Sequence, residues 1–138
     1  MRWRKAERDF VARARVARLA TVDAKGVPTN VPVCPLFEGG KIYVGTAANS
    51  KKVRNILARS HVAITFDEYS ENWSSLRGVM IQGQAVVVRA RTRSQRTFLK
   101  LRRKLYTKYP QYESSSPLNE ADAAIIEINP HYKMSWGV

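Results

Sequence analysis

Residues 16–46 read VARLATVDAKGVPTNVPVCPLFEGGKIYVGT, and this stretch decides the fold class. Three of its segments are rich in β-branched and apolar residues and predict strands: Val16–Val22, Pro28–Phe37 and Lys41–Thr46. DAKG (residues 23–26) and EGGK (residues 38–41) separate these segments and have the composition of tight turns. The three prolines of the second segment favour an edge or bulged strand. We therefore predict three consecutive strands joined as hairpins.

Further strands are predicted in the rest of the chain. Their expected ranges are His61–Asp67, Arg77–Ala90 and Ala123–Asn129, the last followed by a tail that ends in Trp136. Gly83 lies inside the second of these strands, where a glycine indicates a bulge or a close backbone approach.

Three helices are expected between or before the strands. The first is indicated by the helical spacing of Trp3, Ala6, Phe10, Ala14 and Ala17. A short helix is predicted over Lys51–Arg59, with Asn49 or Ser50 as its N-cap. A longer helix is expected to begin at a Ser94 cap and run to about Tyr109, where Pro110 ends it. A polar loop is expected over residues 113–120.

Tight turns between most strands predict an antiparallel β-barrel with peripheral helices, in one domain that spans residues 1–138. A doubly wound βαβ fold does not fit these connections, and the sequence contains no GxGxxG motif.

Charge is the unusual feature of the composition. The chain has 24 Lys and Arg against 11 Asp and Glu, a formal net charge of +13, and the bases are concentrated in the first eighteen residues and in Arg89–Lys108. An excess of this kind indicates an anionic partner, such as a nucleic acid, an acidic membrane surface or a polyanionic small molecule. A well-solvated basic surface is the alternative.

Cys34 is the only cysteine, so no internal disulfide can form and a reducing compartment is expected. The N-terminus lacks the apolar stretch of a signal peptide, and the apolar runs are too short to span a bilayer. We therefore expect a cytoplasmic protein with no membrane partner. Cys34 itself is predicted to be a small buried residue.

The segment IYVGTAANSKKVRNI (residues 42–56) carries the most informative motif. A strand is expected to end at Gly45 and Thr46, and a helix to begin at Ser50, Lys51 and Lys52. A helix start offers free backbone N–H groups, and the hydroxyl and ammonium groups around it suit a phosphate. An ordinary helix cap with two solvated lysines explains the same residues equally well.

Arg18, at the start of the strand RLATV, is a second candidate phosphate contact, although an ordinary surface arginine fits as well. Catalytic side-chain sets are missing, because the only histidines are His61 and His131 and Cys34 has no CxxC partner. We predict no metal site, and the catalytic residues stay unknown. An enzyme so poor in acid–base groups needs a cofactor for its reaction.

Taken together, these segments resemble the FMN-binding split-barrel proteins related to pyridoxamine 5′-phosphate oxidase. The resemblance is carried by RLATVDAKGVP, by Thr46 with Ser50-Lys51-Lys52, and by RGVMIQGQA at Arg77–Ala85. The stretches DEYSENWSSLRGV (67–79), KYPQY (108–112) and the closing Trp136-Gly137 are most similar to the branch expected to use the deazaflavin F420.

The resemblance implies a split antiparallel β-barrel, a homodimer, and a cofactor that is FMN or, alternatively, F420. It implies phosphate contacts from Thr46, Ser50, Lys51, Lys52 and Arg18. It implies ring contacts from Leu19, Ala20, Thr21, Val22, Arg77 and Gly78, with Gly45 beside the phosphate motif and Trp136 against the groove from the partner chain. The expected function is a hydride-transferring oxidoreductase acting on a small-molecule substrate that the sequence does not identify.

Two departures from the oxidase pattern lead us to expect that the chain is not pyridoxamine phosphate oxidase itself. The oxidase has a glutamine where this chain has Gly78, and it continues past its C-terminal tryptophan into a segment that this sequence does not contain. Two alternative functions are a flavin-binding carrier or sensor without turnover and a nucleic-acid-binding barrel, and nucleic acid is the least favoured partner. Dimerisation is also expected because Val79, Ile81 and Val87 would otherwise face water.

Overall fold

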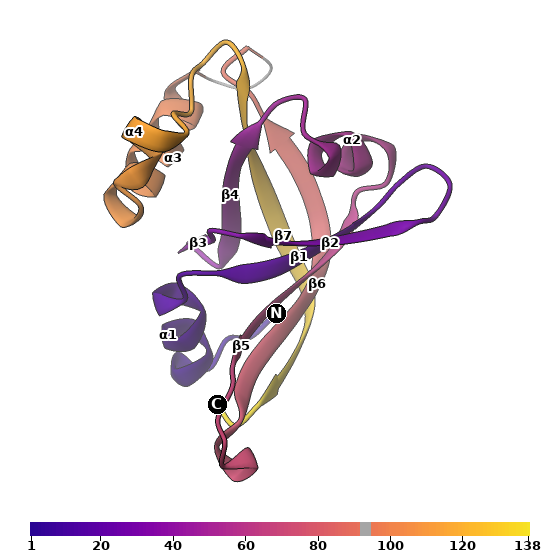
Figure 1. Cartoon of the computed structure of the whole chain (residues 1–138), viewed down its shortest axis with the longest axis vertical. Coiled ribbons are helices and arrows are strands. Elements are labelled where there is room, and N and C mark those ends of the chain that lie inside the picture. Colours follow the sequence, from indigo (N-terminus) through magenta and orange to yellow (C-terminus); the bar gives the residue numbers. More distant parts are fainter. Residues whose placement is uncertain (92–94) are drawn as a thin grey trace.

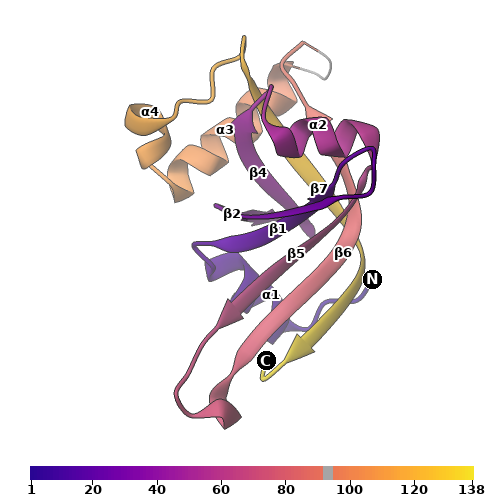
Figure 2. The same cartoon turned by 45° about the vertical axis from the view of Figure 1, so that its right-hand side comes forward.

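The computed structural model describes residues 1–91 and 95–138, and it is mainly antiparallel β structure with helices at the periphery (Figures 1 and 2). The strands are β1 (Ala17–Val22), β2 (Pro28–Val33), β3 (Leu36–Glu38), β4 (Lys41–Ala47), β5 (His61–Glu68), β6 (Arg77–Val88) and β7 (Ala123–Trp136). The helices are α1 (Lys5–Arg13), α2 (Lys51–Ala58), the 3₁₀ turn η1 (Trp73–Ser75), α3 (Gln95–Lys108) and α4 (Gln111–Ser115).

One curled sheet contains these seven strands in the order β2-β1-β5-β6-β7-β4-β3, and each pair of neighbouring strands is antiparallel. The two edge strands, β2 and β3, follow each other in sequence and are separated only by Cys34 and Pro35. The predicted single strand over residues 28–37 is therefore wrong, because the chain leaves one edge of the sheet and enters the other at this point. The barrel is open between these edges, which confirms the predicted split antiparallel β-barrel.

The longest pairing joins β6 to β7. It begins where Gly78 pairs with Trp136 and ends where Val88 pairs with Ile125. Its register shifts between Gln82 and Gly83, and a Cβ atom at Gly83 would overlap the backbone of Asn129. The predicted bulge and close approach at Gly83 are thus confirmed. The expected tail after residue 129 is instead a continuation of β7, because its residues stay paired with β6 as far as Trp136.

Two hydrophobic clusters stabilise the fold. The larger fills the barrel and includes Leu19, Ile64, Phe66, Ile81 and Ile126, all fully buried. The smaller lies under α3; its members are Leu36, Tyr43, Val88, Phe98, Leu101, Leu105, Leu118, Ala123 and Ile125. Helix α3 is thereby fixed on the sheet, on a different side of the barrel from α2 (Figure 1).

The predicted helices are present with different ends. Helix α1 stops at Arg13, and Ala17 belongs to β1. The expected polar loop begins with the last residues of α4, for which Pro110 is the N-cap. The predicted Ser94 cap lies outside the described residues. Within the described chain, no helix is both long and apolar enough to cross a bilayer.

Candidate functional site

The loop between β4 and α2 forms the predicted phosphate motif. Ser50 is the N-cap of α2, and its hydroxyl accepts a hydrogen bond from the Val53 N–H at 3.4 Å. The Ser50 N–H donates to the Ala47 carbonyl at 3.1 Å, so the turn brings Thr46 and Ser50 to the same end of the sheet. This local geometry supports the cap interpretation and leaves Lys51 and Lys52 on the first turn of the helix.

Lys52 is a partly desolvated cation on the first turn of α2. Its side chain is half-buried, and no hydrogen bond or ion pair to it occurs among the described residues. Burial lowers the pKa of its ammonium group, because desolvation disfavours the charged form. An anion beside Lys52 would compensate this cost. Lys51 is exposed and also has no partner in the described chain.

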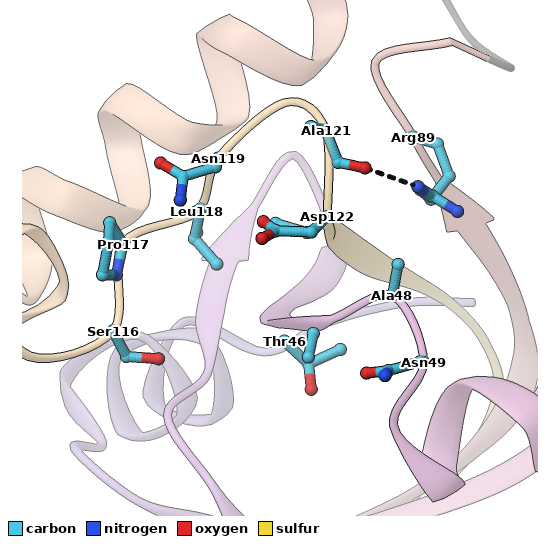
Figure 3. Close-up of a pocket in the computed structure, with 12 residues that line it drawn as sticks. Thr46, Ala48, Asn49, Arg89, Ser116, Pro117, Leu118, Asn119, Ala121 and Asp122 are labelled. Atoms are coloured by element: carbon cyan, nitrogen blue, oxygen red, sulfur yellow. Dashed lines mark hydrogen bonds between the residues drawn. The ribbon is translucent and has the colours of Figure 1, made fainter.

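A pocket of about 640 Å³ adjoins this loop (Figure 3). Thr46 lines it from the end of β4, Asn49 from the loop, and Asp122 from the segment before β7. Arg89 lies on one side, donating to the Ala121 carbonyl at 3.3 Å, while its buried Nε has no hydrogen-bond partner. Our sequence interpretation did not place Arg89 or Asp122 beside this loop, because both residues reach it only through tertiary folding.

A second cluster of predicted residues lies near the opposite end of β6. Arg18 bonds Asp67 at 3.1 Å, and Arg77 bonds Glu68 at 2.9 Å. Together with Trp136, these four residues line a pocket of about 500 Å³. Arg18 therefore lies with the predicted ring contacts and is paired with a carboxylate. The structure does not bring it to the Ser50-Lys51-Lys52 loop of the same chain.

Trp136 lines this second pocket, and Gly78 lies directly against its indole ring. The two residues are directly paired on β7 and β6, and a Cβ atom at Gly78 would overlap the indole ring. Only glycine leaves room for the indole to lie across the strand at this position. The departure from glutamine at residue 78 thus has a physical reason within the chain, since Trp136 occupies the space of a side chain.

The side chains of the strand RLATV alternate between the two faces of the sheet. Leu19 and Thr21 point into the barrel and are fully buried, and the Thr21 hydroxyl accepts a hydrogen bond from the Asn55 amide of α2 at 2.9 Å. Their side chains are thus engaged in the core. Arg18, Ala20 and Val22 lie on the outer face, so a ligand on that face would meet these side chains.

The two clusters are far apart within one chain. Helix α2 contacts the Val22 end of β1, about 13 Å from Arg18 at the usual strand rise. Its C-terminal end lies at Ala85, where the Ser60 carbonyl accepts the Ala85 N–H, about 24 Å along β6 from Gly78. A single chain therefore presents the predicted phosphate contacts and the predicted Arg77–Gly78–Trp136 contacts at separate places.

The outer face between the clusters is exposed and partly apolar. Met134 is 49% exposed and Tyr132 52% exposed, and they pair with Met80 and Gln82 of β6. The expectation that Val79 and Ile81 face water is wrong, because both are fully buried in the barrel. The register places the alternate residues, such as Met80, on the outside.

Cys34 is exposed, contrary to the prediction of a buried residue. It lies in the short connection between the edge strands, where the chain is at the surface. In the described part of the chain, no group of three or more His, Cys, Asp or Glu residues could hold a metal ion.

Solved structures share this fold at low sequence identity. HutZ, the heme storage protein of Vibrio cholerae, is 16% identical with a TM-score of 0.78, and the match covers 97% of this chain and 94% of HutZ. An F420 reductase is 22% identical with a TM-score of 0.73, covering 96% of this chain and 98% of the reductase. Atu2129 of Agrobacterium tumefaciens, of unknown function, is 18% identical with a TM-score of 0.76, and the match covers 94% of this chain but only 54% of Atu2129.

These identities support the fold alone. No curated protein matches the sequence. The family model described as pyridoxamine 5′-phosphate oxidase matches residues 4–134, which is nearly the whole chain. The chain therefore belongs to the pyridoxamine 5′-phosphate oxidase family.

Proposed function

We propose that this protein is an oxidoreductase that binds FMN, or alternatively F420, in grooves shared by two copies of the chain. The observation that carries the proposal is Lys52, a half-buried ammonium group with no counter-ion among the described residues, on the first turn of a helix capped by Ser50. A phosphate at this position would compensate the buried charge and accept hydrogen bonds from the free N–H groups of the helix start.

The phosphate grip would come from Thr46, Ser50, Lys51 and Lys52, with Gly45 beside them. Two cations and two hydroxyl groups match the oxygen atoms and the double charge of a phosphate monoester. Arg89 and Asn49 lie on the adjacent pocket wall, where they could contact groups next to the phosphate. Thr46 lines the same pocket, so the phosphate motif and this pocket wall are adjacent.

The ring would lie on the outer face of a sheet, against Ala20 and Val22 of one protomer. The pocket lined by Arg77 and Trp136 offers a large aromatic surface and an arginine. An indole ring suits a tricyclic ligand, because offset or edge-on contacts between aromatic rings are favourable.

A homodimer would bring these halves together. Because phosphate and ring contacts lie apart on one chain, a two-fold arrangement can place the Trp136 pocket of one protomer beside α2 of the other. The partly apolar outer face, with Met134, Tyr132 and Val86 exposed, is suited to burial in such an interface.

When bound, the cofactor would supply hydride transfer. The chain itself would fix the ring and exclude water from one side of it, and Arg18 and Arg77 would set the positive potential near it. Both arginines are held in place by Asp67 and Glu68. A flavin carrier without turnover would use the same contacts. Turnover by the purified protein would exclude this alternative.

Titration of the purified protein with FMN and with F420, followed by ligand fluorescence, tests this proposal. We expect one of the two to bind, and the Lys51→Ala/Lys52→Ala variant to bind it a few hundred-fold more weakly, from two charge-assisted hydrogen bonds. The matched control is Arg2→Ala/Lys25→Ala, which removes two exposed charges elsewhere. Equal affinity for both variants would refute the phosphate assignment.

A further inference from the structure

Helix α3 carries a basic surface that the proposed cofactor site does not use. Six of its fourteen residues are bases and none is an acid. These bases are Arg96, Lys100, Arg102, Arg103, Lys104 and Lys108.

Three of the six bases are engaged in holding the fold. Arg102 donates to the Leu118 carbonyl at 3.1 Å, and Lys104 forms an ion pair with Glu38 at 2.5 Å. Lys108 donates to the carbonyl groups of Ala12 at 3.0 Å and of Pro35 at 2.8 Å. Their charges are therefore explained by packing contacts.

The other three bases have no such explanation. Arg96, Lys100 and Arg103 are exposed, and the described chain contains no hydrogen bond or ion pair to their side chains. Their spacing of four and three residues places them on one side of the helix. We call these three residues the basic face of α3; it extends about 10 Å along the helix axis.

The basic face is held rigidly. Phe98, Leu101 and Leu105 on the opposite side of α3 are buried in the smaller hydrophobic cluster. The Tyr106 hydroxyl also accepts a hydrogen bond from the Leu118 N–H at 2.8 Å. A helix fixed in this way presents its cations without further loss of backbone entropy on binding.

The chemistry of this surface favours a phosphodiester backbone over a membrane. A membrane-binding helix combines its bases with exposed large apolar side chains. In the described part of α3 no large apolar residue is exposed. The next exposed residue on the same side as the basic face is Thr107, which is polar. One acid lies close by, since Glu113 lines a surface groove with Arg102 and Arg103.

We propose that the basic face of α3 binds the phosphate backbone of nucleic acid without reading its sequence. The three cations extend over about 10 Å, which is about three steps of 3.4 Å along one strand of a duplex, so each cation can contact a different phosphate of that strand. Arg102, stacked on Tyr106 with its guanidinium 5.8 Å from the ring centroid, borders the same surface. The inference is independent of the cofactor proposal, because α3 and α2 lie on different sides of the barrel (Figure 1).

Anisotropy titrations of a fluorescein-labelled short DNA duplex with the full chain test this proposal. Three phosphate contacts predict affinity that falls about 40-fold between about 50 and 200 mM salt. Lys100→Gln/Arg103→Gln leaves one contact, so we expect only about a four-fold fall and weaker binding at low salt. The control Arg2→Gln/Lys25→Gln, with the same net charge, should keep the full salt dependence, as should the charge-conserving Lys100→Arg/Arg103→Lys.

Three results would overturn the proposal. One is equal loss of binding in the two glutamine variants, which would mean that net charge alone matters. Another is duplex affinity of the wild-type protein that does not respond to salt. The third is binding to phosphatidylcholine–phosphatidylserine vesicles, but not to the duplex, that the Lys100/Arg103 glutamine variant abolishes. Overlapping circular-dichroism unfolding curves show that the variants fold.

Discussion

Replacing Lys52 with methionine should separate stability from ligand binding. In the ligand-free protein, Lys52 is a half-buried cation whose pKa is lowered by desolvation and which no carboxylate of the described chain compensates. Methionine has similar length and no charge, so Lys52→Met removes this cost. We therefore expect the free energy of unfolding of the ligand-free protein to stay the same or rise.

Cofactor affinity should move in the opposite direction. A hydrogen bond between an ammonium group and a phosphate contributes about 1.5–3 kcal/mol, so Lys52→Met should weaken binding about 10- to 150-fold. Urea unfolding of the ligand-free protein and fluorescence titration with FMN and F420 measure the two effects. Lys25→Met, at an exposed position, is the control and should change neither. A Lys52→Met protein that is less stable and binds as tightly as wild type would refute the reasoning.

Three further predictions concern the Gly78–Trp136 pair, the buried carboxylate Glu7 and the outer face of the sheet. Gly78→Ala should push the Trp136 indole off the strand, lower stability by about 1–3 kcal/mol and weaken cofactor binding; adding Trp136→Ala should restore stability, measured by urea unfolding, without restoring affinity. Buried Glu7 has a pKa lowered from 4.5 to about 2: burial raises it, but hydrogen bonds from the Arg4 N–H, Lys133 and Ser135 outweigh that effect. Between these two pKa values the unfolded chain binds more protons than the folded chain, so about 3 kcal/mol of stability is present above pH 4.5 and lost as the pH falls towards 2. Glu7→Gln should therefore flatten this part of the curve of unfolding free energy against pH. An unchanged curve would contradict this role of Glu7. Met134→Glu should convert a dimer of twice 15.7 kDa into monomers in sedimentation equilibrium, and a wild-type monomer that still binds cofactor tightly would exclude a shared groove.

Much of the fold followed from local sequence patterns. The segments rich in β-branched and apolar residues, together with the turns DAKG and EGGK, predicted the hairpins correctly, because both signals are local. The break at Cys34 was missed because leaving one sheet edge for the other depends on closure of the whole barrel. The extension of β7 to Trp136 was missed for a similar reason, since pairing with β6 holds residues whose own sequence reads as a tail.

The site was predicted less completely than the fold. The helix cap at Ser50 was readable because capping is local, and the placement of Lys51 and Lys52 followed from it. Arg89 and Asp122 were not readable, since they meet the β4–α2 loop only through the sheet. The sequence also gave no sign that Arg18 pairs with Asp67, or that Gly78 is needed by Trp136, because both contacts join distant segments.

Subunit complementation tests the central claim, a cofactor groove shared between two chains. The Lys51→Ala/Lys52→Ala variant lacks the phosphate half of the groove, and Trp136→Ala lacks the ring half, so neither should bind cofactor on its own. After the two are unfolded together and refolded in equal amounts, half of the dimers are mixed, and each mixed dimer has one intact groove. Fluorescence titration should then recover about one quarter of the wild-type binding sites. A mixture that recovers no sites, although mixed dimers form, would contradict the shared groove.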